Sequence, residues 1–408
     1  MKKWMMSLAA VPVIVGSMGA AASAAEESIV ILDGMKVSGE IRPRYEMADV
    51  KDNGLDTANA FTARTRLAVE GTLLGLEGLT AKVGMTSVNN FGYNDYAPQD
   101  ATYDLILDPQ QAILTEGYLA YTAADTTLLA GRSFVNLDDQ RFVGTVGWRQ
   151  MERAYDTVTV VNKSVEGLTL LGAWVYGYQG VNSNPTTDTG SALLNVNYKA
   201  GDALTVSLFD YMLADIHDTY GVRVSGVVPL KGVKFDYAAS YAMQTDATLD
   251  YALDTAPKID ASYYDIALGA NISGLIAGAE YEVLGDASGS STKGFTTPLA
   301  TLHKFQGWAD VFLGRTAGSN NDGLADLSVK LGYAAPGFGK LLGLYHKFDA
   351  LSGTNKDLGS EFDVMYANSV PGVKDLAFLA KAAFYSKGDT GNDVTKAWLQ
   401  LDYKFATK

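Results

Sequence analysis

The 408-residue sequence has no cysteine and only three histidines. Without cysteine the chain forms no disulfide, carries no thiol nucleophile and offers no thiolate to a metal. The histidines, His217, His303 and His346, lie far apart and suggest no metal site. Neither a G-x-S-x-G nucleophile elbow nor an H-E-x-x-H zinc motif occurs. We therefore expect a protein that is not an enzyme and has no cofactor.

Long apolar runs are also missing, except at the N-terminus. Residues 1–24 combine Lys2 and Lys3, an apolar segment and the small-residue sequence Ala22-Ser23-Ala24. This pattern predicts a cleaved signal peptide rather than a membrane-spanning helix, which needs about 20 apolar residues. Cleavage would remove two lysines and no acid, taking the formal charge from −14 to −16. An acidic exported chain is not expected to bind nucleic acid.

Alternating polar and apolar residues are what the chain has instead of helical patterns. From Lys36 to Met47, polar side chains occupy every second position and mostly apolar ones lie between them. Successive strand side chains point to opposite faces, so such a strand has one polar and one apolar face. The pattern recurs at 61–71, 233–242, 275–284, 324–333 and 397–405. In an exported, Gly- and Tyr-rich chain it predicts a transmembrane β-barrel with its apolar face toward lipid.

The connections fall into short glycine turns and long polar loops. The long ones are 48–59, 89–112, 133–150, 178–190, 212–218, 244–259, 285–322, 350–357 and 386–394. Both ends of a bacterial barrel lie in the periplasm, so the strand number must be even. Residues 304–313 resemble a strand, but we place them inside the loop 285–322 to satisfy this parity.

We therefore predict an all-β fold, a single transmembrane antiparallel barrel of about 18 strands over residues 25–408, with 16 strands as the alternative. Closure is required because an open sheet would leave edge amides unsatisfied in lipid. Short turns are expected on the periplasmic side and long loops outside. A secreted soluble β-sandwich or β-helix is the competing fold. Strand assignment is ambiguous for 154–162 and 341–348.

Eight of the ten arginines lie between residues 42 and 153. Arg42 and Arg44 are two residues apart on one predicted strand, as are Arg64 and Arg66 on the next, so all four should point into the lumen. The loop 133–150 and its flanks add charges of both signs. The residues that we expect to line the pore or its constriction are Arg42, Arg44, Arg64, Arg66, Arg132, Asp138, Asp139, Arg141, Arg149, Glu152 and Arg153.

These charges have two compatible interpretations. The acids can pair with the arginines and hold the loop in place, as crowded charges in a restricted lumen usually do. An arginine wall that faces loop acids can also set up a field across a constriction, and rings of charged side chains determine ion selectivity in pores. The guanidinium group suits carboxylates and phosphates, so we expect a local attraction for anions.

A stretch of this loop resembles a known family. The sequence GRSFVNLDDQRFVGTVGWRQMERAYD, residues 131–156, is similar to a segment of the alginate-export family of Gram-negative outer-membrane porins. The matching positions are Arg132, Asp138, Arg141, Trp148 and Arg149. HKFQGWADVFL, residues 303–313, resembles a second shared segment. The resemblance implies a barrel of about 18 strands and export of an acidic polysaccharide through an arginine-lined pore.

The residues themselves favour a porin in the outer membrane of a Gram-negative bacterium. Such a porin is a water-filled channel for passive diffusion of small hydrophilic solutes, anions among them, with loop 133–150 as the constriction. The expected partners are outer-membrane lipid and lipopolysaccharide, the transported solutes and the barrel-assembly machinery. One alternative is an exporter of an anionic polysaccharide such as alginate. Another is a closed structural or adhesive barrel whose long loops act outside the cell.

Overall fold

The computed structural model describes residues 31–182, 185–251, 258–287, 291 and 293–407. The expected signal peptide, residues 1–24, lies outside this part of the chain. No helix in the described ranges is long and apolar enough to cross a membrane. The elements are β1 (Leu32–Val50), β2 (Ala58–Leu73), β3 (Leu79–Asn89), β4 (Gln111–Ala123), β5 (Thr126–Ser133), β6 (Ala154–Asn162), β7 (Leu168–Gln179), β8 (Thr187–Ala200), β9 (Leu204–Leu213), β10 (His217–Leu230), β11 (Val233–Thr245), β12 (Asp260–Ile272), β13 (Leu275–Leu284), η1 (Leu302–Lys304), η2 (Arg315–Ser319), β14 (Leu324–Ala335), β15 (Gly339–Asp349), β16 (Asp357–Ser369), β17 (Leu376–Ser386) and β18 (Val394–Ala406).

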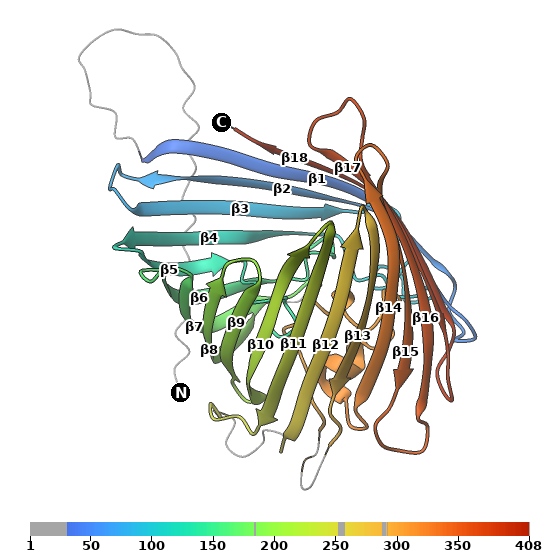
Figure 1. Ribbon diagram of the computed structural model, residues 1–408. Helices are drawn as coiled ribbons and strands as arrows, with labels where there is room; N and C mark the ends of the chain where they lie inside the picture. The colour runs from blue at the N-terminus through green and yellow to red at the C-terminus, as the bar shows by residue number, and fades with distance from the viewer. Residues whose placement is uncertain (1–30, 183–184, 252–257, 288–290, 292, 408) are drawn as a thin grey trace, which may run out of the picture.

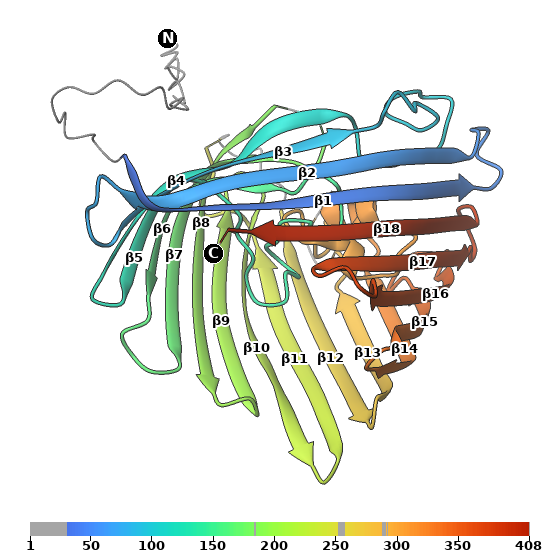
Figure 2. The ribbon, with the colours of Figure 1, turned by 90° about the horizontal axis from the view of Figure 1, so that it is seen from above.

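The strands form one closed antiparallel barrel (Figures 1 and 2). Each strand pairs with the next in the chain, and β18 pairs with β1 to close the ring. The prediction of 18 strands, with the strand-like segment 304–313 inside a loop, is confirmed. The two ambiguous segments are also strands: residues 154–162 are β6, and 341–348 lie within β15. Closure pairs the first and last strands, which would otherwise be free edges.

The faces of the first strand show how the barrel is oriented. The outward side chains Ile41 and Tyr45 are 44% and 38% exposed, whereas the inward Arg44 and Glu46 are each 1% exposed. The apolar face thus lies outside and the charged face lines the interior, which is the inverse of a soluble protein.

Loops fill much of the interior at the end of the barrel opposite the chain termini. Three of them matter for the site: loop 2 (90–110), loop 3 (134–153) and loop 7 (285–323). Loop 7 contains η1 and η2 and includes residues 303–313. Gly307 has a φ of +79° and Asp310 a φ of +60°. These left-handed conformations interrupt any strand and explain why this periodic segment folds as a loop.

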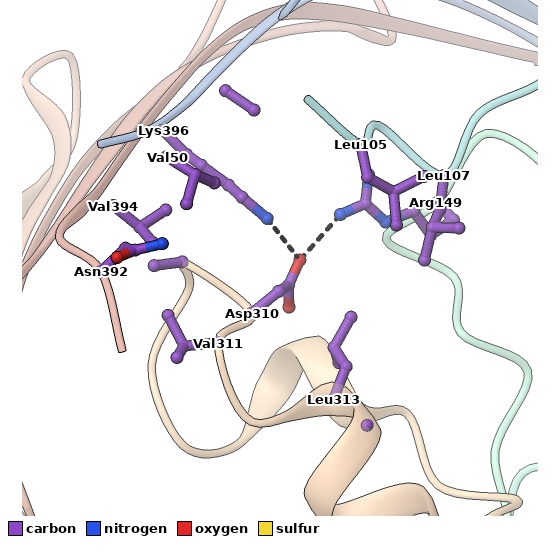
Figure 3. Close-up of a pocket in the computed structure, with 13 residues that line it drawn as sticks. Val50, Leu105, Leu107, Arg149, Asp310, Val311, Leu313, Asn392, Val394 and Lys396 are labelled. Atoms are coloured by element: carbon purple, nitrogen blue, oxygen red, sulfur yellow. Dashed lines mark hydrogen bonds and ion pairs between the residues drawn. The ribbon is translucent and has the colours of Figure 1, made fainter. Parts of the chain in front are cut away.

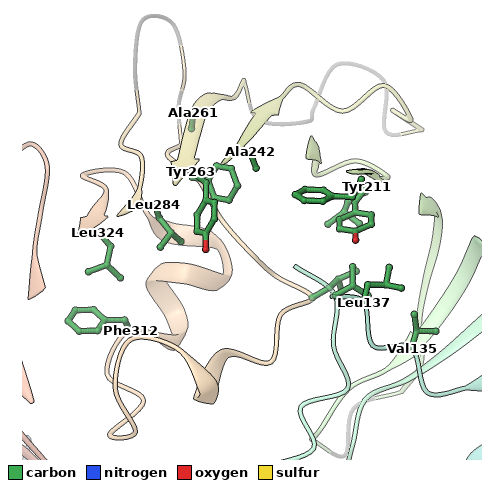
Figure 4. Packing of buried hydrophobic residues seen from close by; sticks show 14 of the residues in the cluster. Val135, Leu137, Tyr211, Ala242, Ala261, Tyr263, Leu284, Phe312 and Leu324 are labelled. Carbon is green, nitrogen blue, oxygen red and sulfur yellow. The ribbon is translucent and has the colours of Figure 1, made fainter. Parts of the chain in front are cut away.

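The apolar core lies between these loops and the wall, as Figure 4 shows for part of it. Phe142 of loop 3 has its ring centroid 5.0 Å from that of Phe209 on β9 and 5.3 Å from that of Tyr263 on β12. Phe295 of loop 7 lies 5.3 Å from Tyr263. The loops are therefore packed against the barrel by buried aromatic rings, and this packing positions their charges.

Candidate functional site

The arginines of β1 and β2 meet on one arc of the wall. Arg42 and Arg64 are direct partners in the strand register. Glu40 joins them, because its Oε1 lies 2.7 Å from an Nη2 of each arginine. Arg42 also pairs with Asp402 of β18 at 3.0 Å, and Arg64 with Glu152 of loop 3 at 3.3 Å. Each guanidinium on this arc therefore has carboxylate partners already present in the protein.

The other two wall arginines follow the same rule. Arg44 is 1% exposed and lies 3.4 Å from a carboxylate oxygen of Asp108 in loop 2. Its Nη2 also donates to the backbone carbonyl of Trp148 at 2.5 Å. Arg66 forms an ion pair with Glu152 and keeps about a fifth of its side chain exposed. The wall thus binds loop 2 and loop 3 through paired charges.

Loop 3 is fixed at two places on the wall by Arg149 and Arg141. Arg149 Nη1 lies 3.0 Å from Glu46 Oε1 on β1, and its Nη2 lies 2.7 Å from Asp310 Oδ2 of loop 7. Arg141 pairs with Glu282 on β13 and is fully buried. In the ring order, β1 and β13 are six strand pairings apart through β18 to β14. Loop 3 therefore spans a third of the circumference between these two ion pairs.

Burial and charge act in opposite directions on the pKa of Arg149. Burial lowers it, but the carboxylates of Glu46, Asp108 and Asp310 outweigh burial, so the pKa is raised above its ordinary value. Burial likewise raises the pKa of the Asp310 carboxyl, but His303, Lys396 and Arg149 lower it more, and it lies well below its ordinary value. Both groups are charged throughout the physiological range.

Loops 3 and 7 are joined to each other by backbone hydrogen bonds. Gly144 N donates to Leu299 O at 2.9 Å, and Thr301 N donates to Gln140 O at 3.0 Å. Side chains add further contacts to backbone carbonyls: Lys304 Nζ donates to Asp139 O at 2.7 Å and Arg153 Nη2 to Pro298 O at 3.2 Å. Because buried backbone groups must be paired, the two loops behave as one inner unit.

The ionised groups of the arginine arc balance in number. Six basic and six acidic side chains are linked by ion pairs into two connected sets. Pairing, rather than a bare positive wall, is what the contacts show. The twelve residues are Arg42, Arg44, Arg64, Arg66, Arg149, Lys396, Glu40, Glu46, Asp108, Glu152, Asp310 and Asp402.

Five of the expected site residues lie away from this arc: Arg141, which pairs with Glu282 on β13, and the four described next. Arg132 pairs with Asp156 across β5 and β6, with 2.7 Å between Nε and Oδ1. Arg153 lies over the ring of Tyr178 on β7 at 5.7 Å. The two aspartates of loop 3 face β8 to β10. Asp138 accepts hydrogen bonds from Asn195 and Tyr211, and Asp139 pairs with Arg223 at 3.0 Å.

The predicted site omitted six of the twelve paired residues, and it also omitted Lys381 of β17. Glu40, Glu46 and Asp402 lie on the polar faces of predicted strands, and the other three are Asp108, Asp310 and Lys396. Lys396 could have been found, because it continues the alternation of the last strand two residues before Trp398 and six before Asp402. Asp108 lies in an aperiodic loop, and Lys381 lies on a strand of mostly small apolar residues, so the sequence gives no positional signal for either. Asp310 lies in the strand-like segment 304–313, whose alternation does not show which residues of the wall it meets once the segment folds as a loop.

A hollow of about 390 Å³ lies at the loop-filled end of the barrel (Figure 3). Its walls are mainly apolar and include Val50 of β1 and Leu105 of loop 2. Charge is confined to one place, where Arg149 and Lys396 meet Asp310 between them at 2.7 and 3.7 Å. The hollow thus combines mainly apolar walls with two cations that share one carboxylate.

Solved structures from two bacteria share this architecture, although no protein-family model and no curated protein matches the chain. Pseudomonas aeruginosa OccK9 (OpdG) has a TM-score of 0.73 at 17% identity, covering 92% of this chain and 100% of that one. Acinetobacter baumannii OccAB2 has a TM-score of 0.72 at 16% identity, covering 93% and 99%. Pseudomonas aeruginosa OpdO has a TM-score of 0.71 at 16% identity, also covering 93% and 99%. At these identities the likeness shows the barrel fold.

The expected membership of the alginate-export family is wrong. The structures that this chain is similar to are outer-membrane porins of the Occ and Opd kind. The segment that suggested the family contains two arginines whose ion pairs hold loop 3 on the wall. Arg141 pairs with Glu282, and Arg149 pairs with Glu46. Any barrel that folds a charged loop inward must pair its buried charges. The motif is explained by this requirement and does not indicate a shared substrate.

Proposed function

We propose that the protein is an outer-membrane porin of a Gram-negative bacterium, a channel for passive diffusion of small hydrophilic solutes. The observation that carries the proposal is a closed barrel whose apolar side chains face outward and whose charged side chains face an interior narrowed by loops 3 and 7. Lipid supplies the environment that the outer face requires. The likeness to Occ and Opd barrels supports the same function.

The accessible cations favour anionic solutes. Most of the arginines are buried with their acids and hold loops. Three cations of the arc keep part of the side chain exposed: Arg66 at 21%, and Arg42 and Lys396 at 10% each. A solute carboxylate or phosphate would contact these three side chains rather than the fully buried guanidiniums. Arginine offers a planar pair of donors to such groups.

Single-channel recording in planar bilayers tests the proposal. The protein should insert as a channel of steady conductance, with a reversal potential in a salt gradient that indicates weak preference for anions. Absence of any conductance from correctly folded protein, shown by heat-modifiable migration on gels, would overturn it. Strong cation selectivity would be consistent with a porin but would contradict the proposal that the arginines attract anions.

A closed structural or adhesive barrel is the second candidate, because loops 2, 3 and 7 place fully buried side chains such as Tyr96, Arg141 and Phe295 inside the barrel. The conductance measurement separates it from a porin. A polysaccharide exporter is not proposed, since the resemblance on which it rested is wrong. The signal peptide and the barrel-assembly machinery as a partner remain predictions from the sequence.

A further inference from the structure

Lys381 of β17 occupies an unusual place under the hollow. Its Nζ lies 3.7 Å from the ring centroid of Trp308, 4.2 Å from that of Trp148 and 5.4 Å from that of Trp398. These rings come from loop 7, loop 3 and β18. Among the residues that the structure describes, no carboxylate oxygen is within ion-pair distance of Nζ. Burial therefore opposes a charged Lys381, and the carboxylates of Asp363 and Asp310 favour its charge only from beyond ion-pair distance.

The indole rings stabilise this charge. The face of an indole attracts a cation within about 6 Å of its centroid, and more strongly when water is excluded. Lys381 is 8% exposed and Trp398 is 1% exposed. Trp148 is held from the wall by a second cation, since the guanidinium carbon of Arg44 lies 4.2 Å from its ring centroid. Two cations of the barrel wall therefore hold one ring of loop 3.

We call Lys381 and the three indole rings around it, those of Trp148, Trp308 and Trp398, the tryptophan cage. A chain of hydrogen bonds connects this cage to the hollow. Lys381 Nζ lies 2.7 Å from His303 Nε2, and His303 Nδ1 lies 2.8 Å from Asp310 Oδ1. The other oxygen of Asp310 binds Arg149 and lies near Lys396. Burial lowers the pKa of His303 well below its ordinary value, so the ring is neutral. A neutral imidazole accepts from Lys381 at one nitrogen and donates to Asp310 at the other.

The strand register places the tryptophan cage next to the charged groups of the hollow. Lys396 is in the hollow, and Trp398, two residues further along the same face of β18, is the strand partner of Lys381. Loop 7 crosses at this level, where Trp308 N donates to Asp363 at 3.3 Å and Ala309 N to Glu361 at 2.7 Å. Both loops that narrow the lumen therefore contact Lys381 or its immediate neighbours.

We propose that Lys381 is a positioning residue of the constriction: its ammonium, held by one tryptophan from each inner loop and one from β18, fixes loops 3 and 7 to the wall. It acts through Trp148, Trp308 and His303 and does not touch the solute. The inference rests on the proposed porin function, because it concerns the width of the passage. Without the ammonium, the loops should leave the wall more often and the passage should widen.

A single introduced thiol tests this cleanly, because the chain has no cysteine of its own. Ala300 of loop 7 is fully buried, so Ala300→Cys should react slowly with a maleimide in the otherwise unchanged full-length barrel. Adding Lys381→Met should raise the labelling rate about tenfold or more, and single-channel conductance and open-channel noise should rise with it. A tenfold factor corresponds to roughly 1.4 kcal/mol of lost loop stabilisation.

The control variants separate charge from packing. Methionine keeps the length and apolar stem of the lysine, so a space-filling role would leave the labelling rate unchanged, and that result would overturn the proposal. Trp308→Leu should raise the rate as Lys381→Met does, whereas Trp308→Phe, which keeps an aromatic face, should raise it less. Lys340→Met removes an exposed lysine from β15 and should change nothing. Thr354→Cys, on an exposed loop, should label rapidly in every background.

The readouts also distinguish this proposal from the porin proposal. If the unmodified protein conducts but Lys381→Met alters neither labelling nor conductance, the role of Lys381 is wrong and the porin stands. If the unmodified protein does not conduct while Lys381→Met accelerates labelling, Lys381 holds the loops of a closed barrel and its role in a constriction is wrong.

Discussion

Arg149 and Glu46 form a buried ion pair, with 3.0 Å between Nη1 and Oε1, that ties loop 3 to the first strand of the barrel. The two side chains are 4% and 1% exposed, so water cannot solvate the remaining charge when its partner is removed. The pair joins residues more than 100 positions apart in the sequence. Because Arg149 also pairs with Asp310, it positions loop 3 between the wall and loop 7.

Removing one charge of this pair should be more harmful than removing both. Arg149→Met leaves Glu46, Asp108 and Asp310 without a shared cation, and breaking a buried pair typically costs about 3–5 kcal/mol. Arg149→Met combined with Glu46→Gln should recover part of this loss. The temperature at which the folded band disappears on gels measures both. Equal destabilisation by the single and double variants would contradict the pairing argument.

Acidification should loosen loop 7 through His303. Its pKa in the folded state lies well below 6.5, because burial opposes the charged ring. When the loop is released, the ring regains its ordinary pKa and binds a proton below about pH 6.5. Stability is therefore complete above that pH and falls as the pH drops below it, by up to about 1.4 kcal/mol per unit.

The unfolding temperature at pH 7.5 and pH 5.0 measures this effect, and His303→Gln provides the comparison. Glutamine can still accept from Lys381 and donate to Asp310, but it does not titrate. The difference between the two pH values should shrink in this variant. Asp310 contributes little to the difference, because its pKa is depressed below this whole range. An unchanged difference would place the titrating group elsewhere.

Neutralising Arg66 should change ion selectivity with little effect on folding. Arg66 is the most exposed arginine of the arc, and its pair with Glu152 is partly open to solvent. A partly exposed charge is worth about 0–1 kcal/mol, so Arg66→Gln should shift the anion-to-cation permeability ratio about two- to fivefold toward cations. Reversal potentials in a salt gradient give the ratio. Lys340→Gln serves as the lumenal control at the other end of the barrel.

Gly307→Ala should displace loop 7, whereas Gly314→Ala should be tolerated. A Cβ at Gly307 would lie 2.5 Å from the carboxylate of Glu361, and its φ of +79° is unfavourable for alanine. Gly314 has a φ of −66° and open space around its Cα. We expect Gly307→Ala to cost about 1–2 kcal/mol from backbone conformation alone. Limited proteolysis within loop 7 should be faster in this variant only.

Much of the barrel was predictable because strand alternation is a local property. The polar face of 36–47 and the glycine turns needed no knowledge of distant residues, and strand parity then placed 304–313 in a loop. The ion-pair partners of the arginines were harder to predict from the sequence. That Arg141 would meet Glu282, or Arg149 both Glu46 and Asp310, depends on how far loop 3 reaches across the lumen. No periodicity encodes that reach.

Strand alternation alone is enough to predict a barrel with charged residues inside, because successive side chains of a strand must face opposite sides and only one side can meet lipid. What those charges do depends on the folded arrangement of the loops. Ion pairing depends on distances of 3–4 Å between atoms that are far apart in the chain, and loop packing sets those distances. The same arginines could have formed a bare cationic wall, but the inward loops bring carboxylates to them and leave three cations partly exposed.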